Sequence, residues 1–250
     1  MVRRSARERR RLLWRGAMGT PVEFSSHEPL GHNEQLGPAR TRAIAMANSM
    51  RRKYAILVCA ALVLAGADSA RAADSDPAAA QVQTLTASLL KSMQAGAAVS
   101  MTERYRDLEP VIEQVFALPL VTRLSVGPEW ANFSPDQQQA LIAAFSRYTV
   151  ANYAHNFRNF NGQKFEIDDA VVSRGQDKIV RTRIVHRPDP PVSMFYRMHE
   201  VDGTWKIIDV DTEGVSALAL HRTDFAAAIA SGGAPLLIAH LNKASDGLMK

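Results

Sequence analysis

The sequence predicts an α+β fold in which an antiparallel, twisted sheet of about four strands is covered by helices. Between Pro77 and Phe160, apolar residues recur every three or four positions, which is the period of a helix with one buried face. From Lys164 to Glu213 they recur at every second position, which is the period of a strand with one buried face. The helical period returns after Ser216, so helices precede and follow the sheet.

Residues 50–72 have the three parts of a secretory signal peptide. A basic segment, Arg51–Lys53, precedes the 14-residue apolar run Tyr54–Ala67, and small residues surround Ala72. A membrane-spanning helix needs about 20 apolar residues, so an uncleaved anchor is the less favoured alternative. We expect cleavage after Ala72 and export of residues 73–250.

Residues 1–49 are rich in Arg, Gly and Pro and show neither a helical nor a strand period. We expect them to be a disordered extension that results from a mis-set translation start, with Met46 or Met50 as the first residue. The formal charge of +5 comes from the N-terminal part of the chain, because residues 1–72 hold 13 Lys and Arg against 5 Asp and Glu. Residues 73–250 hold 17 against 20, so we expect no nucleic-acid partner for the exported domain.

Three helices should precede the strands. The first should end at Gly96, the second should be bent or divided by Pro110, and the third should run to Gly162. The third begins at the run Ser134–Gln137, which combines an N-cap serine, a proline at the first helical position and a capping-box glutamine. The apolar positions are Val82, Leu85, Leu89 and Met93, then Tyr105, Leu108, Ile112 and Val115, then Ile142, Phe145, Thr149, Tyr153, Phe157 and Phe160.

Four runs with alternating apolar residues predict the strands, at residues 164–173, 178–187, 191–201 and 204–213. Turn signals rich in Gly, Pro and Asp join them, so an antiparallel meander is expected. One face of this sheet is apolar and needs a cover, which the long third helix with its aromatic stripe should provide.

Two further helices should follow the strands, at residues 217–233 and 234–245. The first carries Leu218, Phe225 and Ile229 at helical spacing, and the pair Gly232–Gly233 is a C-cap signal.

The motifs of common enzymes are absent from the sequence. It has no serine-hydrolase elbow, no glycine-rich nucleotide loop and no zinc-protease motif. The only cysteine, Cys59, lies in the predicted signal peptide, so the exported domain would have neither a disulfide nor a thiolate. We therefore predict no catalytic residue, no metal site and no cofactor. No two histidines of the exported domain have the spacing of metal ligands; these histidines are His155, His186, His199, His221 and His240.

Three acidic residues, Asp209, Asp211 and Glu213, occupy alternate positions of the last predicted strand. On a regular strand they would share one face, where a hard cation such as magnesium could bridge them. This permits a metal-dependent hydrolase as an alternative function. Trp205 and Ile207 share the same parity, however, so the face begins apolar and becomes acidic as the strand ends. That gradient favours a strand that leaves the core and enters solvent.

Four segments of the exported domain resemble the MlaC, or toluene-tolerance, family of periplasmic lipid-binding proteins. They are residues 104–116, 124–145, 203–216 and 221–241, and together they cover most of the domain. The motifs LSVGPEW, SPDQQQALIAAF and ASGG are most similar to the hopanoid-biosynthesis-associated branch, HpnM.

The resemblance implies a periplasmic carrier that holds the apolar part of a phospholipid or hopanoid-type lipid in a cavity between sheet and helices. Its implied partners are an inner-membrane transport complex of the ABC type and an outer-membrane acceptor or donor, in a system that maintains outer-membrane lipid asymmetry. An acyl chain exposed to water costs on the order of 10 kcal/mol, at about 0.8 kcal/mol per methylene, so such a carrier should release lipid to water only slowly.

Helix spacing and strand parity select the residues that would line this cavity. If the core is closed instead, the protein would be a structural periplasmic partner without lipid. The predicted lipid-binding residues are Phe145, Thr149, Tyr153, Met194, Tyr196, Met198, Trp205 and Ile207.

Overall fold

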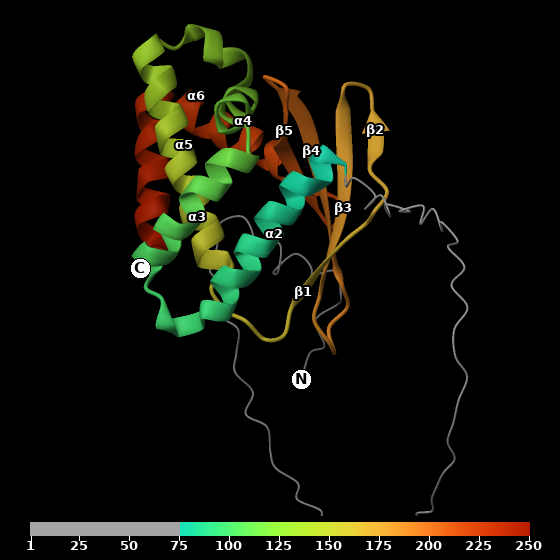
Figure 1. The fold of residues 1–250 in the computed structure, drawn as a ribbon. Coiled ribbons are helices and arrows are strands. Elements are labelled where there is room, and N and C mark those ends of the chain that lie inside the picture. Colours follow the sequence, from blue (N-terminus) through green and yellow to red (C-terminus); the bar gives the residue numbers. More distant parts are fainter. Residues whose placement is uncertain (1–75) are drawn as a thin grey trace, which may run out of the picture. The chain divides into compact units, whose positions relative to one another are not determined.

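The computed structural model describes residues 76–250. The predicted extension and signal peptide lie outside this range. The described residues form two layers, in which helices α2 to α6 lie on one side of an antiparallel sheet (Figure 1). This arrangement confirms the predicted α+β class.

Helices α2 (Pro77–Ala95) and α3 (Met101–Val115) form an antiparallel pair. Side-chain hydrogen bonds from α3 hold the end of α2. Arg104 is buried and donates hydrogen bonds to the Ser92 carbonyl, to Ser92 Oγ at 2.8 Å and to the Gly96 carbonyl at 2.6 Å. It thereby satisfies carbonyl groups that the end of α2 leaves unpaired. Pro110 lies on the exposed side of α3, where water can reach the carbonyl it leaves free, and α3 is not divided there.

Helix α2 lies against the sheet, and one ion pair joins its first turn to a strand. Asp76 caps the helix through the Ala78 N–H at 2.9 Å, and Lys178 Nζ binds the same carboxylate at 2.7 Å. Helix α4 (Leu118–Val126) follows a short parallel bridge between Phe116 and Ile207 and also contacts the sheet.

The long helix α5 (Pro135–Asn156) begins with the predicted capping box, in which Ser134 and Gln137 exchange hydrogen bonds. It ends before the predicted Gly162, and Phe160 lies beyond it with 40% of its surface exposed. The asparagines in this stretch compete with the helix for backbone hydrogen bonds. The prediction that this helix covers the sheet needs correction, because α5 packs mainly against α3, α4 and α6.

The sheet has the order β1-β3-β4-β5-β6, and β2 also pairs with β3. The first predicted run is divided, because residues 168–171 leave the sheet between β1 and β2. The strands are β1 (Lys164–Ile167), β2 (Val172–Arg174), β3 (Asp177–Val185), β4 (Val192–Val201), β5 (Thr204–Thr212) and β6 (Val215–Ser216).

A β-bulge in β5 changes which side chains face the core. Ile207 pairs with Met198 of β4, but Asp209 pairs with Arg197, so Ile208 is an extra residue. Beyond the bulge, the buried residues Val210 and Thr212 continue the core face, opposite Tyr196 and Met194. The prediction that Asp209, Asp211 and Glu213 share the face of Trp205 and Ile207 is therefore wrong.

Helix α6 (Ala217–Leu248) consists of two arms, residues 217–231 and 234–248, which are separated by non-helical backbone at Gly232 and Gly233. Gly233 has a φ of 64°, a conformation that glycine adopts without strain. The first arm contacts α4 through a hydrogen bond from Arg222 Nε to the Leu124 carbonyl at 2.8 Å. The second arm lies beside α5, where Arg147 binds Asp246 at 2.6 Å.

By length and composition, α6 is the one helix among residues 76–250 that could cross a membrane. Its glycine break leaves arms of 15 residues. Each arm is about 22 Å long at 1.5 Å per residue, which is shorter than a hydrocarbon core of about 30 Å. Neither arm is long enough to span a bilayer by itself.

Candidate functional site

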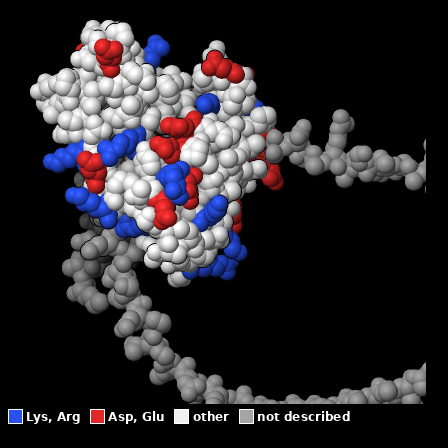
Figure 2. Space-filling model, turned by 60° about the vertical axis from the view of Figure 1, so that its left-hand side comes forward, with Lys and Arg blue, Asp and Glu red and all other residues white. Residues whose placement is uncertain are grey.

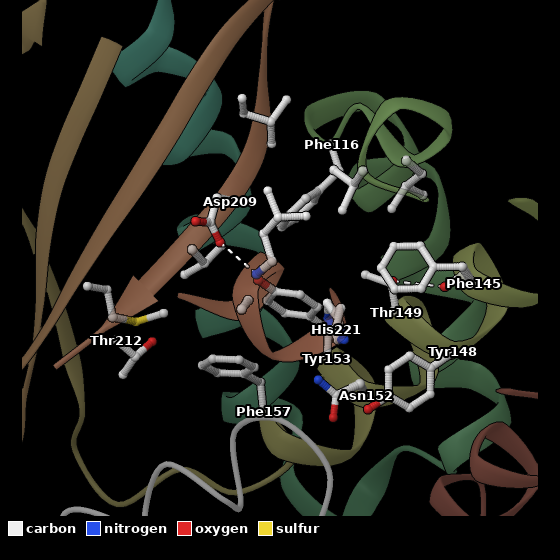
Figure 3. A pocket seen from close by; sticks show the side chains of 17 residues that line it. Phe116, Phe145, Tyr148, Thr149, Asn152, Tyr153, Phe157, Asp209, Thr212 and His221 are labelled. Carbon is white, nitrogen blue, oxygen red and sulfur yellow. Dashed lines mark hydrogen bonds between the residues drawn. The ribbon is translucent and has the colours of Figure 1, made fainter. Parts of the chain in front are cut away.

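A cavity lies where α4, α5 and the first arm of α6 face the end of the sheet (Figure 3). Its volume is about 70 Å³. The sheet contributes Met194 of β4 and the bulged end of β5, and the helices contribute mainly apolar and aromatic side chains. The helical and connecting residues that line it are Phe116, Leu118, Val121, Phe145, Tyr148, Thr149, Asn152, Tyr153, Phe157, Ala217, Leu218 and His221.

Aromatic rings form one end of the cavity. Tyr153 stacks on Phe157 with ring centroids 5.6 Å apart, and it also contacts Phe116 at 5.6 Å. Phe157 continues to Phe165 of β1 at 6.2 Å. Burial raises the pKa of Tyr153 well above 10, so its phenol stays neutral at physiological pH. This end of the cavity is therefore aromatic, and Tyr153 contributes no charge to it.

A second group of rings lies nearer the start of α5 and includes the imidazole of His221. The ring of His221 lies 5.2 Å from Phe145, 6.3 Å from Tyr148 and 5.6 Å from Phe225. Desolvation among these rings lowers the pKa of His221 to about 4, although the nearby Asp209 carboxylate acts in the opposite direction. His221 is therefore a neutral side chain at pH 7.

The three carboxylates of the β5 end have separate partners. Asp209 accepts hydrogen bonds from the Leu218 N–H at 2.9 Å and from Ser216 Oγ at 2.6 Å, at the start of α6. Asp211 accepts from the Gly214 N–H at 2.7 Å, and Glu213 accepts from the Ser193 N–H at 2.6 Å.

These carboxylates stabilise the path of the chain from β5 through β6 to α6. Within residues 76–250, no three carboxylate, imidazole or thiol side chains are grouped closely enough to hold a metal ion. Asp209 also binds the first turn of α6, where the helix dipole favours a negative charge.

Four of the predicted lipid-binding residues line the cavity: Phe145, Thr149, Tyr153 and Met194. The other four do not line it. Tyr196, Met198 and Ile207 lie in the closed core on the same face of the sheet.

Trp205 lies at the start of β5, where Lys178 Nζ is 4.5 Å from its ring centroid. Strand parity identifies the face of a side chain, but it does not tell how far along the strand the cavity extends.

Several cavity residues were not among the predicted ones. Phe116 and Leu118 come from the connection between α3 and α4, whose approach to the sheet is a long-range contact. Tyr148 and Asn152 lie on α5 beside the predicted stripe, and His221 lies on the first arm of α6. The helical spacing of Leu218, His221 and Phe225 is a signal that could have placed His221 on the buried side.

Comparison with known proteins identifies a family and a similar solved structure. Residues 81–243 match the family model described as MlaC protein. The structure is similar to the phospholipid-binding protein from Ralstonia solanacearum, which was solved in complex with a phospholipid. The sequences are 21% identical, the match covers 69% of this chain and 99% of that one, and the TM-score is 0.61. At this identity, the likeness shows that the two proteins share a fold.

Proposed function

Because the chain belongs to the MlaC family, we propose that it is a periplasmic lipid-binding carrier and not an enzyme. It holds the apolar part of a phospholipid or hopanoid-type lipid between the sheet and the helices. The observation that carries this proposal is the apolar, aromatic cavity between β4, β5, α5 and α6. The Ralstonia protein of the same fold was solved with a phospholipid, which supports the same class of ligand here.

The chemistry of the cavity wall supports binding rather than catalysis. Its Tyr153 and His221 side chains are neutral at pH 7, and its carboxylate, Asp209, is occupied by two hydrogen bonds at the start of α6. Hydrocarbon gains about 0.8 kcal/mol per methylene when such a surface removes it from water.

The cavity must widen when lipid enters. Its volume of about 70 Å³ compares with roughly 300–1,000 Å³ for the sites of drug-sized ligands. The walls can separate without breaking the sheet, because α5 packs mainly against other helices and faces the strands across the cavity. We therefore propose that lipid loading displaces α5 and the first arm of α6 from the end of β4 and β5.

The carrier exchanges lipid with an inner-membrane transport complex and an outer-membrane acceptor or donor. A lipid in a bilayer is already shielded from water, so transfer in either direction is nearly balanced and requires a docked partner. Spontaneous release into water is slow, because it exposes to water the hydrocarbon that the cavity shields. The HpnM-like motifs make a hopanoid-type lipid one of the two ligands to be distinguished.

Organic extraction of the protein purified under native conditions, followed by mass spectrometry, tests this function. We expect phospholipid or hopanoid at up to one lipid per chain. Repeated extraction from several preparations without any lipid would support the closed-core structural partner instead. The same sample tests export, since the expected mature N-terminus is Ala73, and residues retained upstream would contradict cleavage after Ala72.

A further inference from the structure

A second pocket, which we call the α6 cleft, lies between the two arms of α6 and Tyr148 of α5. Its volume is about 500 Å³, and it is more open than the cavity described above. Buried apolar side chains, including Phe225, Leu237 and Leu241, form its floor. Exposed polar residues complete its lining: Asp224, His240 and Lys243.

The α6 cleft and the core cavity share two lining residues, Tyr148 and His221. Their rings are 6.3 Å apart and nearly perpendicular, and Figure 3 shows both side chains at the wall of the core cavity. The boundary between the two spaces therefore includes side chains.

His221 is a polar group in an aromatic environment without a polar partner. Phe145, Tyr148 and Phe225 surround its ring, and no hydrogen bond reaches its imidazole from any group within residues 76–250. His221 is half-buried, and a neutral imidazole has one donor and one acceptor nitrogen with which it can bind a ligand. A ligand group with a polar atom at this position would satisfy it.

The surroundings on the two sides of His221 differ in polarity. On one side, the core cavity is lined mainly by rings and aliphatic side chains, which accept hydrocarbon; its polar lining residues are Thr149, Asn152, Asp209 and Thr212. On the other side, the rim of the α6 cleft carries Lys243 and Asp224, and neither has an ion pair within the described part of the chain. Charges of opposite sign on one rim are complementary to a zwitterionic group.

We propose that the α6 cleft holds the polar head of a bound zwitterionic phospholipid, while its hydrocarbon passes Tyr148 and His221 into the core cavity. His221 hydrogen bonds to an ester oxygen at the junction, and Lys243 lies nearest the phosphate. This inference rests on the proposed function and adds to it a head-group site and a route of entry.

The variant His221→Phe tests the junction, because phenylalanine keeps the ring packing and removes both hydrogen-bonding nitrogens. Delipidated protein is titrated with vesicles of fluorescently labelled phosphatidylethanolamine, and the bound fraction is measured after separation. Loss of one buried hydrogen bond should weaken binding roughly tenfold. The control is His186→Phe, since His186 lines neither pocket. Equal affinity of wild type and His221→Phe would overturn the role of His221.

The imidazole can also be observed directly by ¹⁵N NMR of histidine-labelled protein before and after loading with the same phospholipid. We expect the ring nitrogen signals of His221 to shift on loading and those of His186 to stay unchanged. A purely structural His221 would show no hydrogen-bond shift, and that result would contradict the proposal even if His221→Phe failed to fold.

Two substitutions of exposed residues test the cleft. Ala244→Trp fills it, and Ala239→Trp is the matched control, because Ala239 is exposed on the same arm and does not line the cleft. We expect Ala244→Trp and the charge reversal Lys243→Glu each to reduce phospholipid uptake several-fold, with Ala239→Trp at the wild-type level. If wild type binds phospholipid and both cleft variants bind it equally well, the head-group site is wrong while the carrier function stands.

Discussion

Whether a side chain lines the cavity depends on the face of the strand or helix on which it lies. Met194 and Phe195 are neighbours on β4, but Met194 lines the cavity, whereas Phe195 lies on the opposite face of the sheet with 37% of its surface exposed. The alternation of a strand separates two residues of similar hydrophobicity into different environments. A charge at one position should therefore affect lipid binding, and a charge at the other should not.

The substitution Met194→Glu should reduce the amount of lipid that co-purifies, because an ionised carboxylate in the cavity wall opposes burial of hydrocarbon. Its expected effect is a loss of at least about tenfold, corresponding to 1.4 kcal/mol or more. Extraction and mass spectrometry measure it, and Phe195→Glu is the control. Equal lipid content in the two variants would remove Met194 from the binding site.

His221 should make the folded protein sensitive to acid. Its pKa is about 4 in the folded protein and about 6.5 when unfolded, so the unfolded chain binds more protons between these values. Stability is fully present above pH 6.5 and falls as the pH decreases towards 4, by at most about 3 kcal/mol from this group. Urea unfolding at pH 7 and pH 4.5 should show a smaller decrease for His221→Phe than for wild type. The same decrease in both proteins would contradict this assignment.

At the scale of elements, the junction between β5 and α6 shows how acidic residues can serve structure. The bulge at Ile208 moves Asp209 to the start of α6, where its carboxylate binds the Leu218 N–H and Ser216 Oγ. This junction also brings Ala217, Leu218 and His221 to the cavity. The carboxylate thus stabilises the part of α6 that forms the cavity wall.

Replacing Asp209 by alanine should lower the free energy of unfolding by about 1–2 kcal/mol, the usual effect of losing a helix-terminal carboxylate and its hydrogen bonds. Asp209→Asn keeps an acceptor and should lose less. Asp211→Ala is the control, because within residues 76–250 the Asp211 side chain binds a single group, the Gly214 N–H of the exposed turn. Urea denaturation measures all three, and a larger loss for Asp211→Ala than for Asp209→Ala would contradict this account.

On the scale of the whole molecule, the distribution of surface charge determines how strongly the protein is attracted to a charged membrane. The side of the molecule that Figure 2 shows carries Lys and Arg interspersed with Asp and Glu, without a large area of one sign. Residues 73–250 as a whole carry slightly more acidic than basic groups. Adsorption to anionic membranes by charge alone is therefore disfavoured.

Delipidation should make the helical layer more dynamic and leave the centre of the sheet unchanged. We expect faster amide exchange in α5 and the first arm of α6 after lipid removal, and equal exchange in β3, because bound hydrocarbon contributes packing to the cavity wall. Hydrogen–deuterium exchange with mass spectrometry measures both. Equal protection of α5 with and without lipid would show that loading does not involve this wall.

The sequence by itself determined the α+β class, the capping box of α5 and the break of α6 at its two glycines. These features depend on local chemistry: the period of apolar residues, the capping side chains and the freedom of glycine. Only the tertiary structure decided which side chains line the cavity. The bulge at Ile208 depends on pairing between β4 and β5, and the approach of His221 to Tyr148 depends on the packing of α6 against α5. Such contacts join residues that are distant in the chain, and one sequence carries no record of their distances.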